Sequence, residues 1–337
     1  MTDLRNGTVL AQQPPPPPPD VAAFARSFRS LTGVVEQTVH GQAEHVALAA
    51  TCLLAEGHLL IEDVPGVGKT SLATALAAAF GGRFRRIQFT ADLLPGDITG
   101  VTVYDQRRNE FTLHKGPVFA NVVLADEINR ASPKTQSALL EVMSEQQVTI
   151  DGTRHQLESP FLVVATQNPV DHDGTYPLPE AQLDRFLMRL ELGYPDHGAE
   201  RQILAGHRGG AATRPRPVTA LTPEQVRDMA ATARSVHVDD QVADYMIRIA
   251  AATRAAEQTR LGVSPRGTVA LQRAAQVWAA AFGREFVTPD DVVALAPWVL
   301  THRILLTADA EFAGATASGV VQAALDAVAV PRQPVRP

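Results

Sequence analysis

The sequence predicts an α/β domain built on a parallel sheet, followed by a smaller domain made only of helices. Short apolar runs at residues 58–62, 122–125 and 161–165 are typical of buried parallel strands. Helical patterns such as 70–80 and 133–144 separate them, and strands that alternate with helices indicate a doubly wound sheet. Beyond about residue 196 the strand patterns stop. Three helices are then expected to begin at a hydroxyl residue followed by proline, at Thr222 and Pro223, Ser264 and Pro265, and Thr288 and Pro289.

The composition is that of an ordinary globular protein, with 45% hydrophobic and 20% charged residues among 337. No apolar run reaches the roughly 18 to 20 residues that cross a bilayer, and the N-terminus lacks the apolar segment of a secretory signal. Cys52 is the only cysteine, which excludes an intramolecular disulfide and a multi-cysteine metal site. These features predict a cytoplasmic protein without membrane insertion. The net charge of −6 argues against nucleic acid as the main partner.

The distribution of these patterns divides the chain into three segments. Residues 1–20 are expected to form a disordered, proline-rich tail, because the prolines at 14–19 can form neither helix nor sheet. Residues 21–195 form the predicted α/β domain. Residues 196–337 comprise a linker and the helical domain, and the linker is placed at 208–217, where glycine, arginine and proline concentrate.

Two β-hairpins are predicted within the α/β domain. Residues 101–104 and 110–113 alternate polar and apolar side chains around a polar turn at 106–109, which is typical of a hairpin. Residues 148–150 and 155–157 flank an Asp-Gly dipeptide, which favours a tight turn. Both hairpins are therefore expected as inserts in the α/β domain.

A glycine-rich loop between an apolar strand and a helix is the strongest functional signal. Glycines let the backbone wrap closely around phosphate oxygens, so that N–H groups and the positive end of the helix point at the anion. Lys69 can bridge the β- and γ-phosphates, and the Thr70 hydroxyl can bind Mg²⁺. Asp63 stands where such loops commonly begin with glycine. The residues expected to bind nucleotide are Val64, Pro65, Gly66, Val67, Gly68, Lys69, Thr70 and Ser71.

Two carboxylates and one amide complete a predicted hydrolytic site. Asp126 and Glu127 directly follow the apolar strand at 122–125. Asp126 is placed to hold Mg²⁺, and Glu127 is placed to activate the attacking water as general base. Asn168 follows the strand at 161–165 and can orient the same water. The second carboxylate predicts hydrolysis of ATP and not binding alone.

Two arginines are candidates for contacts with ATP phosphates. Arg185 lies in a short helical pattern before the apolar run at 187–192. It can project into the site of a neighbouring subunit, where such an arginine is worth about 10³–10⁵ in rate, or it can pair with Asp184 or Glu180. Arg266 lies in the first turn of a predicted helix, where the helix dipole disfavours a cation. It can bind an anionic ATP phosphate or be an ordinary exposed arginine.

Taken in order, these motifs resemble those of MoxR-type AAA+ ATPases. The similarity runs from about residue 34 to 307, and the matching stretches are EDVPGVGKT (62–70), QFT (88–90), LPGDI (94–98), ADEINRA (125–131), ATQNP (165–169) and LDRF (183–186). The resemblance implies a P-loop AAA+ three-layer sandwich with a parallel sheet, followed by a small all-helical lid domain. It implies Walker A at 66–70, Walker B at Asp126 and Glu127, sensor 1 at Asn168, an arginine finger at Arg185 and sensor 2 at Arg266.

The resemblance also implies cofactors and partners. Proteins of this type use ATP and Mg²⁺, are typically hexameric, and act as chaperone-like factors that mature or assemble protein complexes. They often work with proteins that carry a von Willebrand A (VWA) domain. A hexameric homo-oligomer, a VWA-domain partner and an unknown protein client are therefore expected. Gly41 and Gln42 stand where this class has an adenine-side motif, although His40 replaces its usual aliphatic residue.

Two other functions use the same core. Magnesium-chelatase motor subunits carry a comparable insert and drive metal insertion into a porphyrin, and stimulation of ATP hydrolysis by a chelatase partner would indicate that function. A DNA-acting motor or helicase-loading module is the second alternative, because Arg107 and Arg108 lie at a predicted hairpin tip. Salt-dependent DNA binding would favour it.

Overall fold

The computed structural model describes residues 20–168, 175–208 and 219–331. The predicted tail lies outside these residues except for Asp20, which belongs to the folded part. The Asp20 carboxylate accepts a hydrogen bond of 2.9 Å from the backbone N of Ala23 and caps helix α1 (Val21–Glu36). The predicted linker also lies outside them, apart from Arg208, the last residue of helix α7 (His197–Arg208).

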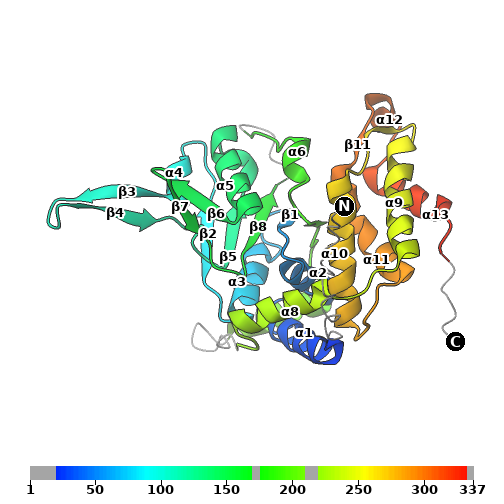
Figure 1. Ribbon diagram of the computed structural model, residues 1–337, viewed down its shortest axis with the longest axis horizontal. Coiled ribbons are helices and arrows are strands. Elements are labelled where there is room, and N and C mark those ends of the chain that lie inside the picture. Colours follow the sequence, from blue (N-terminus) through cyan, green and yellow to red (C-terminus); the bar gives the residue numbers. More distant parts are fainter. Residues whose placement is uncertain (1–19, 169–174, 209–218, 332–337) are drawn as a thin grey trace, which may run out of the picture.

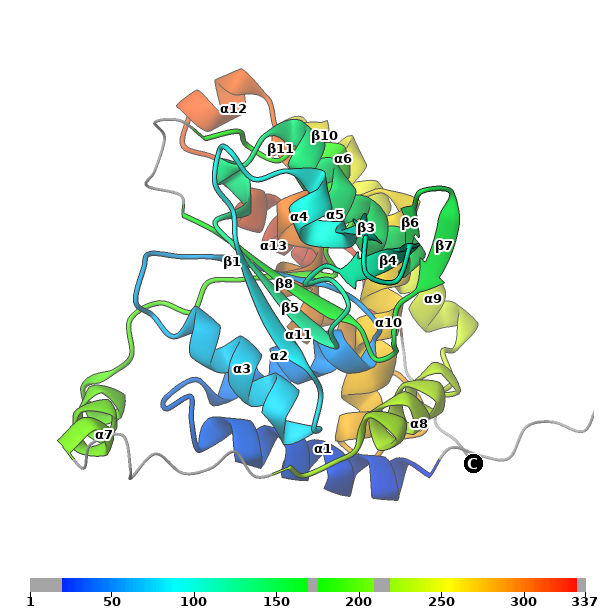
Figure 2. The same cartoon turned by 90° about the vertical axis from the view of Figure 1, so that its left-hand side faces the viewer.

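A five-stranded parallel sheet forms the centre of the first domain (Figure 2), in the spatial order β2-β5-β8-β1-β9. The strands are β1 (Leu59–Glu62), β2 (Phe84–Gln88), β5 (Val122–Asp126), β8 (Leu162–Gln167) and β9 (Met188–Leu190). Four of them lie in predicted apolar runs. The fifth, β2, was not predicted, because it is an edge strand in which only Ile87 is buried.

Helices cover both faces of this sheet, which confirms the predicted three-layer sandwich (Figure 2). The side chains of β1 alternate between the two apolar layers: Leu59 and Ile61 face one, and Leu60 faces the other. Helices α1, α2 (Ala43–Leu54) and α3 (Lys69–Ala79) cover the first face, while α4 (Pro95–Thr99) and α5 (Pro133–Glu145) cover the second. Strands with both faces buried account for the continuous apolar runs of the sequence.

Both predicted hairpins are present. The first is formed by β3 (Gly100–Asp105) and β4 (Glu110–Lys115), and it projects from the body of the molecule (Figure 1). The second is formed by β6 (Gln147–Ile150) and β7 (Thr153–Gln156), with Asp151 and Gly152 at its turn in the left-handed conformation that a tight turn needs. Two short elements complete this domain, the 3₁₀ turn η1 (Ile128–Arg130) and helix α6 (Glu180–Leu183).

The C-terminal part forms the predicted helical lid (Figure 1). Its helices are α8 (Pro223–Arg234), α9 (Asp240–Ala255), α10 (Pro265–Ala281), α11 (Pro289–Leu300), α12 (Ala308–Phe312) and α13 (Ala317–Ala327), with a 3₁₀ turn η3 (Thr301–Arg303). Thr222 and Ser264 accept hydrogen bonds from the first turns of α8 and α10, as their positions before proline predict. The prediction of a domain without strands is wrong in one detail. An antiparallel ladder joins β10 (Thr259–Leu261) to β11 (Leu305–Leu306), and strands this short show no alternation.

The lid and the first domain share one hydrophobic core. The cluster that covers the α1 face of the sheet continues through buried residues of α8, α9, α10, α11 and α13. The lid is therefore packed against the sheet domain on this side and is not merely tethered to it. Among the described helices, none combines the length and apolarity that a membrane crossing requires.

His58 is buried where β1 begins and joins two neighbouring elements. Its Nε2 lies 2.9 Å from the carbonyl oxygen of Met143, and its Nδ1 accepts a hydrogen bond of 3.1 Å from the backbone N of Val163. These partners assign the neutral tautomer with the proton on Nε2. A proton on Nδ1 would face another N–H group. Burial is the main reason that the pKa of His58 falls to about 4.

The free energy of unfolding is expected to depend on pH through this imidazole. The folded pKa lies below the unfolded value of about 6.5, so the unfolded state takes up the proton first, and stability falls as the pH falls through that window. Between pH 7.5 and 4.5 this group should cost about 2 to 3 kcal/mol. Urea unfolding of the wild type and of His58→Gln at both pH values measures it: the stability difference between them should shrink by that amount. His114→Gln is the matched control, because His114 is exposed on β4. An unchanged difference for His58→Gln would contradict this account.

Candidate active site

The carboxyl ends of β1, β5 and β8 open into one cavity of about 360 Å³. Such a crevice at the ends of parallel strands is the usual ligand site of an open α/β sheet. Most of the predicted nucleotide and catalytic residues meet there. The lining residues are Pro65, Gly66, Gly68, Lys69, Thr70, Ser71, Arg86, Gln88, Asp126, Glu127 and Asn168.

The loop after β1 has the geometry of a phosphate cradle. Gly66 and Gly68 adopt φ angles of 91° and 100°, a region that side chains with a Cβ rarely enter. A Cβ atom at either position would have no described atom within 4 Å, so the space above the loop is open. Gly68 is the N-cap of α3, and Lys69 begins that helix. The helix N-terminus and the loop amides are therefore available to an anion.

Lys69 and Asp63 hold the loop in this shape. The ammonium of Lys69 donates a hydrogen bond of 2.6 Å to the carbonyl oxygen of Asp63. Partial burial lowers the pKa of Lys69, and the nearby carboxylates of Asp63, Asp126 and Glu127 act in the opposite direction. The Asp63 carboxylate accepts hydrogen bonds from the backbone N atoms of Val64 (2.8 Å) and Gly193 (2.7 Å). Asp63, which departs from the common loop pattern, thus connects the loop to the segment after β9 by a hydrogen bond.

Asp126 lies at the end of β5 with hydrogen bonds to both carboxylate oxygens. Oδ1 accepts from the Thr166 hydroxyl at 2.6 Å, and Oδ2 accepts from Nη2 and Nε of Arg86 at 2.6 and 3.1 Å. The Thr70 hydroxyl and the Asp126 carboxylate are the hard oxygen donors that Mg²⁺ prefers, and both line the cavity. The guanidinium of Arg86 is bound to Oδ2 of this carboxylate, so a metal ion at that oxygen would take the place of the guanidinium.

Glu127 is held in an uncommon backbone conformation, with φ of 54°. Its N–H group donates to the Thr166 hydroxyl at 2.9 Å, and its Oε2 accepts from Gln88 at 2.9 Å and from Arg130 at 3.1 Å. Asn168 is almost fully buried at the same edge of the sheet. The predicted general base and the predicted water-orienting amide thus directly follow two adjacent strands, and both line the cavity with the phosphate loop.

Four side chains around the carboxylates were missed by the sequence prediction: Arg86, Gln88, Arg130 and Thr166. Arg86 and Gln88 belong to β2, the strand that was not predicted. Gln88 begins the matching stretch QFT, but that match assigned no role to it. Thr166 and Arg130 lie within motifs quoted above. Their sequence neighbours Asp126, Glu127 and Asn168 were assigned roles because carboxylates and amides can act directly on a metal ion or water. Thr166 and Arg130 instead hold the carboxylates in place.

Two predicted arginines lie outside the described lining of the cavity. Arg185 donates to the carbonyl oxygen of Leu140 at 2.8 Å and to the Ser144 hydroxyl, so it lies against the end of α5. Its expected alternative partners are engaged elsewhere: Asp184 pairs with Arg303, and Glu180 pairs with Arg260. Arg266 is exposed in the first turn of α10.

Four predicted nucleotide contacts also lie outside this lining: Gly41, Gln42, Val64 and Val67. Gln42 is buried and donates a hydrogen bond of 2.9 Å to the carbonyl oxygen of Leu192, just after β9. A Cβ atom on Gly41 would lie 2.7 Å from that of Ala199 in α7. Gly41 and Gln42 therefore pack against the chain after β9, and their contact with adenine stays a prediction.

Comparisons with known proteins give a consistent result. Residues 58–188 match the family described as "ATPase family associated with various cellular activities (AAA)", and residues 251–324 match the AAA lid domain. The chain is 46% identical to YeaC of Bacillus subtilis, covering 89% of this chain and 93% of that protein. It is 43% identical to the chaperone MoxR1 of Mycobacterium tuberculosis, covering 88% and 81%. A crystal structure of a candidate ATPase from Cytophaga hutchinsonii superposes with a TM-score of 0.88 at 35% identity, covering 93% of this chain and 97% of that one.

The Thr166 hydroxyl is expected to be needed for the stability of this site. Thr166→Val keeps the shape but removes the hydroxyl, which leaves the N–H of Glu127 and one oxygen of Asp126 without their partner. An unsatisfied buried group costs about 1 to 3 kcal/mol, and the urea midpoint should fall accordingly. Thr166→Ser is the matched control; it keeps the hydroxyl and loses one methyl group, which costs roughly 0.8 kcal/mol. A Thr166→Val protein as stable as the wild type would contradict this role.

Proposed function

The chain belongs to the MoxR family of AAA+ ATPases, and from that premise we propose that it is a chaperone-like motor that hydrolyses ATP to remodel other proteins. The observation that carries the proposal is the single cavity in which the phosphate loop with Lys69 faces Asp126 and Glu127. Binding alone would need only the loop. A second carboxylate beside the first, with an amide next to it, is what hydrolysis of the γ-phosphate needs.

The loop, the two acids and the amide that line the cavity each have a role in the proposed reaction. The loop amides and Lys69 hold the β- and γ-phosphates. Thr70 and Asp126 would hold Mg²⁺, which neutralises charge on the phosphates when bound. Glu127 takes the proton of the attacking water, and Asn168 orients that water. Since Gln88 and Arg130 both donate to Oε2 of Glu127, this oxygen must release a donor before it can accept a proton.

The position of Arg185 outside the cavity of its own chain supports a ring of subunits, which we propose is a hexamer. Arg185 is outside the cavity of its own chain and is bound to the end of α5. In the proposed assembly it extends into the neighbouring site and stabilises charge on the γ-phosphate. Hydrolysis then takes place at subunit interfaces, and the two hairpins and the lid move with the nucleotide state.

The proposed clients are proteins, and the proposed partner carries a VWA domain, in the cytoplasm. The name of the similar chaperone MoxR1 supports a role in the folding or assembly of proteins. A role on DNA is less well supported, because the arginines at the tip of the β3–β4 hairpin are accompanied by acids. Arg108 lies 3.8 Å from both Asp105 and Glu110, so the tip does not present a purely positive surface.

Glu127→Gln should bind ATP and fail to hydrolyse it. The amide keeps the size of the side chain but cannot take a proton, so turnover should fall by about 10²–10⁴. Phosphate release measures the rate, and a fluorescent nucleotide measures the affinity. Glu224→Gln, on the exposed first turn of α8, is the matched control. Turnover of Glu127→Gln at the wild-type rate would contradict the general-base role.

Mixing two inactive variants tests the shared site. Arg185→Ala lacks the finger, and Lys69→Ala lacks the nucleotide contact, so each alone should be nearly inactive. If fingers act on the neighbouring subunit, a 1:1 mixture contains intact sites that face intact fingers, and part of the activity should return. A mixture as inactive as its components, although both assemble, would count against catalysis in trans.

A further inference from the structure

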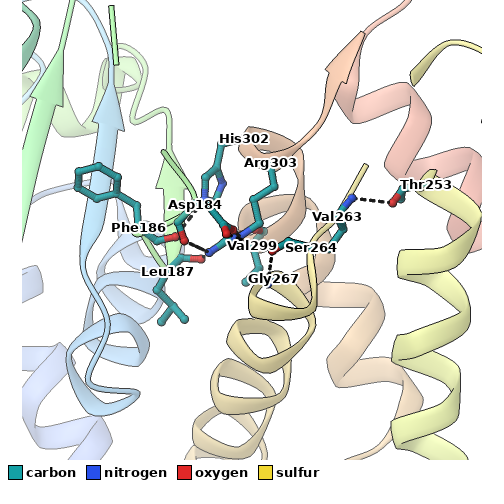
Figure 3. Close-up of polar contacts among 10 residues, drawn as sticks. All are labelled: Asp184, Phe186, Leu187, Thr253, Val263, Ser264, Gly267, Val299, His302 and Arg303. Atoms are coloured by element: carbon teal, nitrogen blue, oxygen red, sulfur yellow. Dashed lines mark hydrogen bonds and ion pairs between the residues drawn. The ribbon is translucent and has the colours of Figure 1, made fainter. Parts of the chain in front are cut away.

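The acid next to the proposed finger is held by the lid of the same chain. Asp184 ends helix α6, directly before Arg185. Its Oδ1 accepts a hydrogen bond of 2.8 Å from Nε of Arg303, and its Oδ2 accepts one of 3.1 Å from the Ser264 hydroxyl (Figure 3). Arg303 belongs to η3, and Ser264 precedes α10. Two separate elements of the lid therefore converge on one carboxylate of the sheet domain.

Arg303 also binds the backbone on both sides of the finger. Its Nη2 donates to the carbonyl oxygens of Asp184 (3.4 Å) and Phe186 (2.5 Å), and its Nη1 donates to that of Leu187 at 3.3 Å. The Arg303 side chain is only 2% exposed. Arg185 thus emerges from a segment whose preceding and following residues are fixed to one buried guanidinium, while its own side chain is part-exposed.

The same cluster includes the first turn of α10, which carries Arg266. Ser264 caps this helix by accepting a hydrogen bond of 3.2 Å from the backbone N of Gly267. A Cβ atom on Gly267 would lie 2.8 Å from Cδ of Arg303, so the absence of a side chain lets Arg303 pass against the helix (Figure 3). A shift of the start of α10 would therefore disturb both hydrogen bonds that the Asp184 carboxylate accepts.

Charge makes Asp184 the residue on which this cluster depends. Burial lowers the pKa of Arg303, the carboxylate of Asp184 raises it, and the positive charge of Arg266 lowers it again. Asp184 is thus the counter-ion that keeps a buried cation beside a second arginine. Among the described residues, the other ion pair between α6 and the lid, Arg260 with Glu180 at 3.0 Å, is exposed and binds no backbone of the finger segment.

We propose that Asp184 is a positioning residue that couples the lid of one subunit to the Arg185 that this subunit offers to its neighbour. The proposal rests on the proposed function, in which Arg185 acts in trans. Nucleotide bound in a subunit pulls the start of α10 towards it. Ser264 and Arg303 then pass this displacement to Asp184. The finger then moves with the nucleotide state of its own subunit.

Mixed rings separate the two places where Asp184 could act. The finger donor carries Glu127→Gln, which binds ATP without hydrolysing it, and the acceptor carries Arg185→Ala, which hydrolyses ATP only beside a donor. Asp184→Asn is then added to the donor or to the acceptor. In the donor it should lower the rate of the mixture by roughly 10- to 100-fold, since small misplacements of a catalytic group cost that much. In the acceptor, whose finger is already absent, it should leave the rate unchanged.

The coupling itself is measured through the nucleotide state of the donor. A Lys69→Ala donor, which lacks the nucleotide contact, should support a different rate from the Glu127→Gln donor, and Asp184→Asn in both donors should make the two rates equal. Glu180→Gln, the matched control, should preserve the difference. If Asp184→Asn is poorly folded in thermal unfolding, Arg303→Lys replaces it in the same arms, because lysine keeps the charge and loses the fork of hydrogen bonds.

Each outcome decides the question. A loss that is equal in both arms, or confined to the acceptor, would show that Asp184 supports the fold or its own site and would overturn the proposal. Equal rates from the two donors with Asp184 intact would overturn the coupling. An inactive mixture of Glu127→Gln and Arg185→Ala without any change at Asp184 would instead refute catalysis in trans, and the proposal with it.

Discussion

The arrangement of the site depends on the position of β8, which lies between β1 and β5 in one parallel sheet. Its register places Thr166 beside Ile61 of β1, at the height where β5 ends in Asp126. The Thr166 hydroxyl can therefore donate to Asp126 and accept from the N–H of Glu127 at once. Parallel strands present their carboxyl ends at one edge, so the backbone ladder alone brings the phosphate loop and the two carboxylates together. A strand pair in antiparallel order would have placed them at opposite ends of the sheet.

Two of the residues that restrain the carboxylates come from β2, the least buried strand of the parallel sheet. Arg86 binds Asp126 and also donates to Gln88 at 3.0 Å, and Gln88 donates to Glu127. This chain of hydrogen bonds links Asp126 to Glu127 through the edge strand β2. Exposed polar side chains exchange protein partners for water at little cost, since a typical hydrogen bond contributes only about 1 kcal/mol net. The acids are thus held in place in a way that small rearrangements of β2 can reverse.

Features signalled by a few consecutive residues could be predicted from the sequence, and features that depend on distant contacts could not. The phosphate loop, the acids at the end of β5, both hairpins and the helices that begin at proline after a hydroxyl residue have local patterns and were found. Strand β2 was missed because only Ile87 of its residues is buried. Nothing in the sequence distinguishes Arg303 from an exposed surface arginine, and its partner Asp184 is 119 residues away in the chain. Only the packing of η3 against the segment before β9 shows that this charge is buried.

The lid touches the sheet domain through two surfaces with different physical character. Near α1 the contact is a continuous apolar core, whose stabilisation depends on buried area and not on direction, so helices can shift there while staying buried. Near β9 the contact is the polar cluster of Arg303, Asp184 and Ser264, whose hydrogen bonds weaken steeply when distances and angles change. A small rotation of the lid is therefore tolerated on the first side and transmitted on the second. The polar contact lies at Asp184, directly before Arg185, so a displacement of the lid would be passed to the segment that carries Arg185.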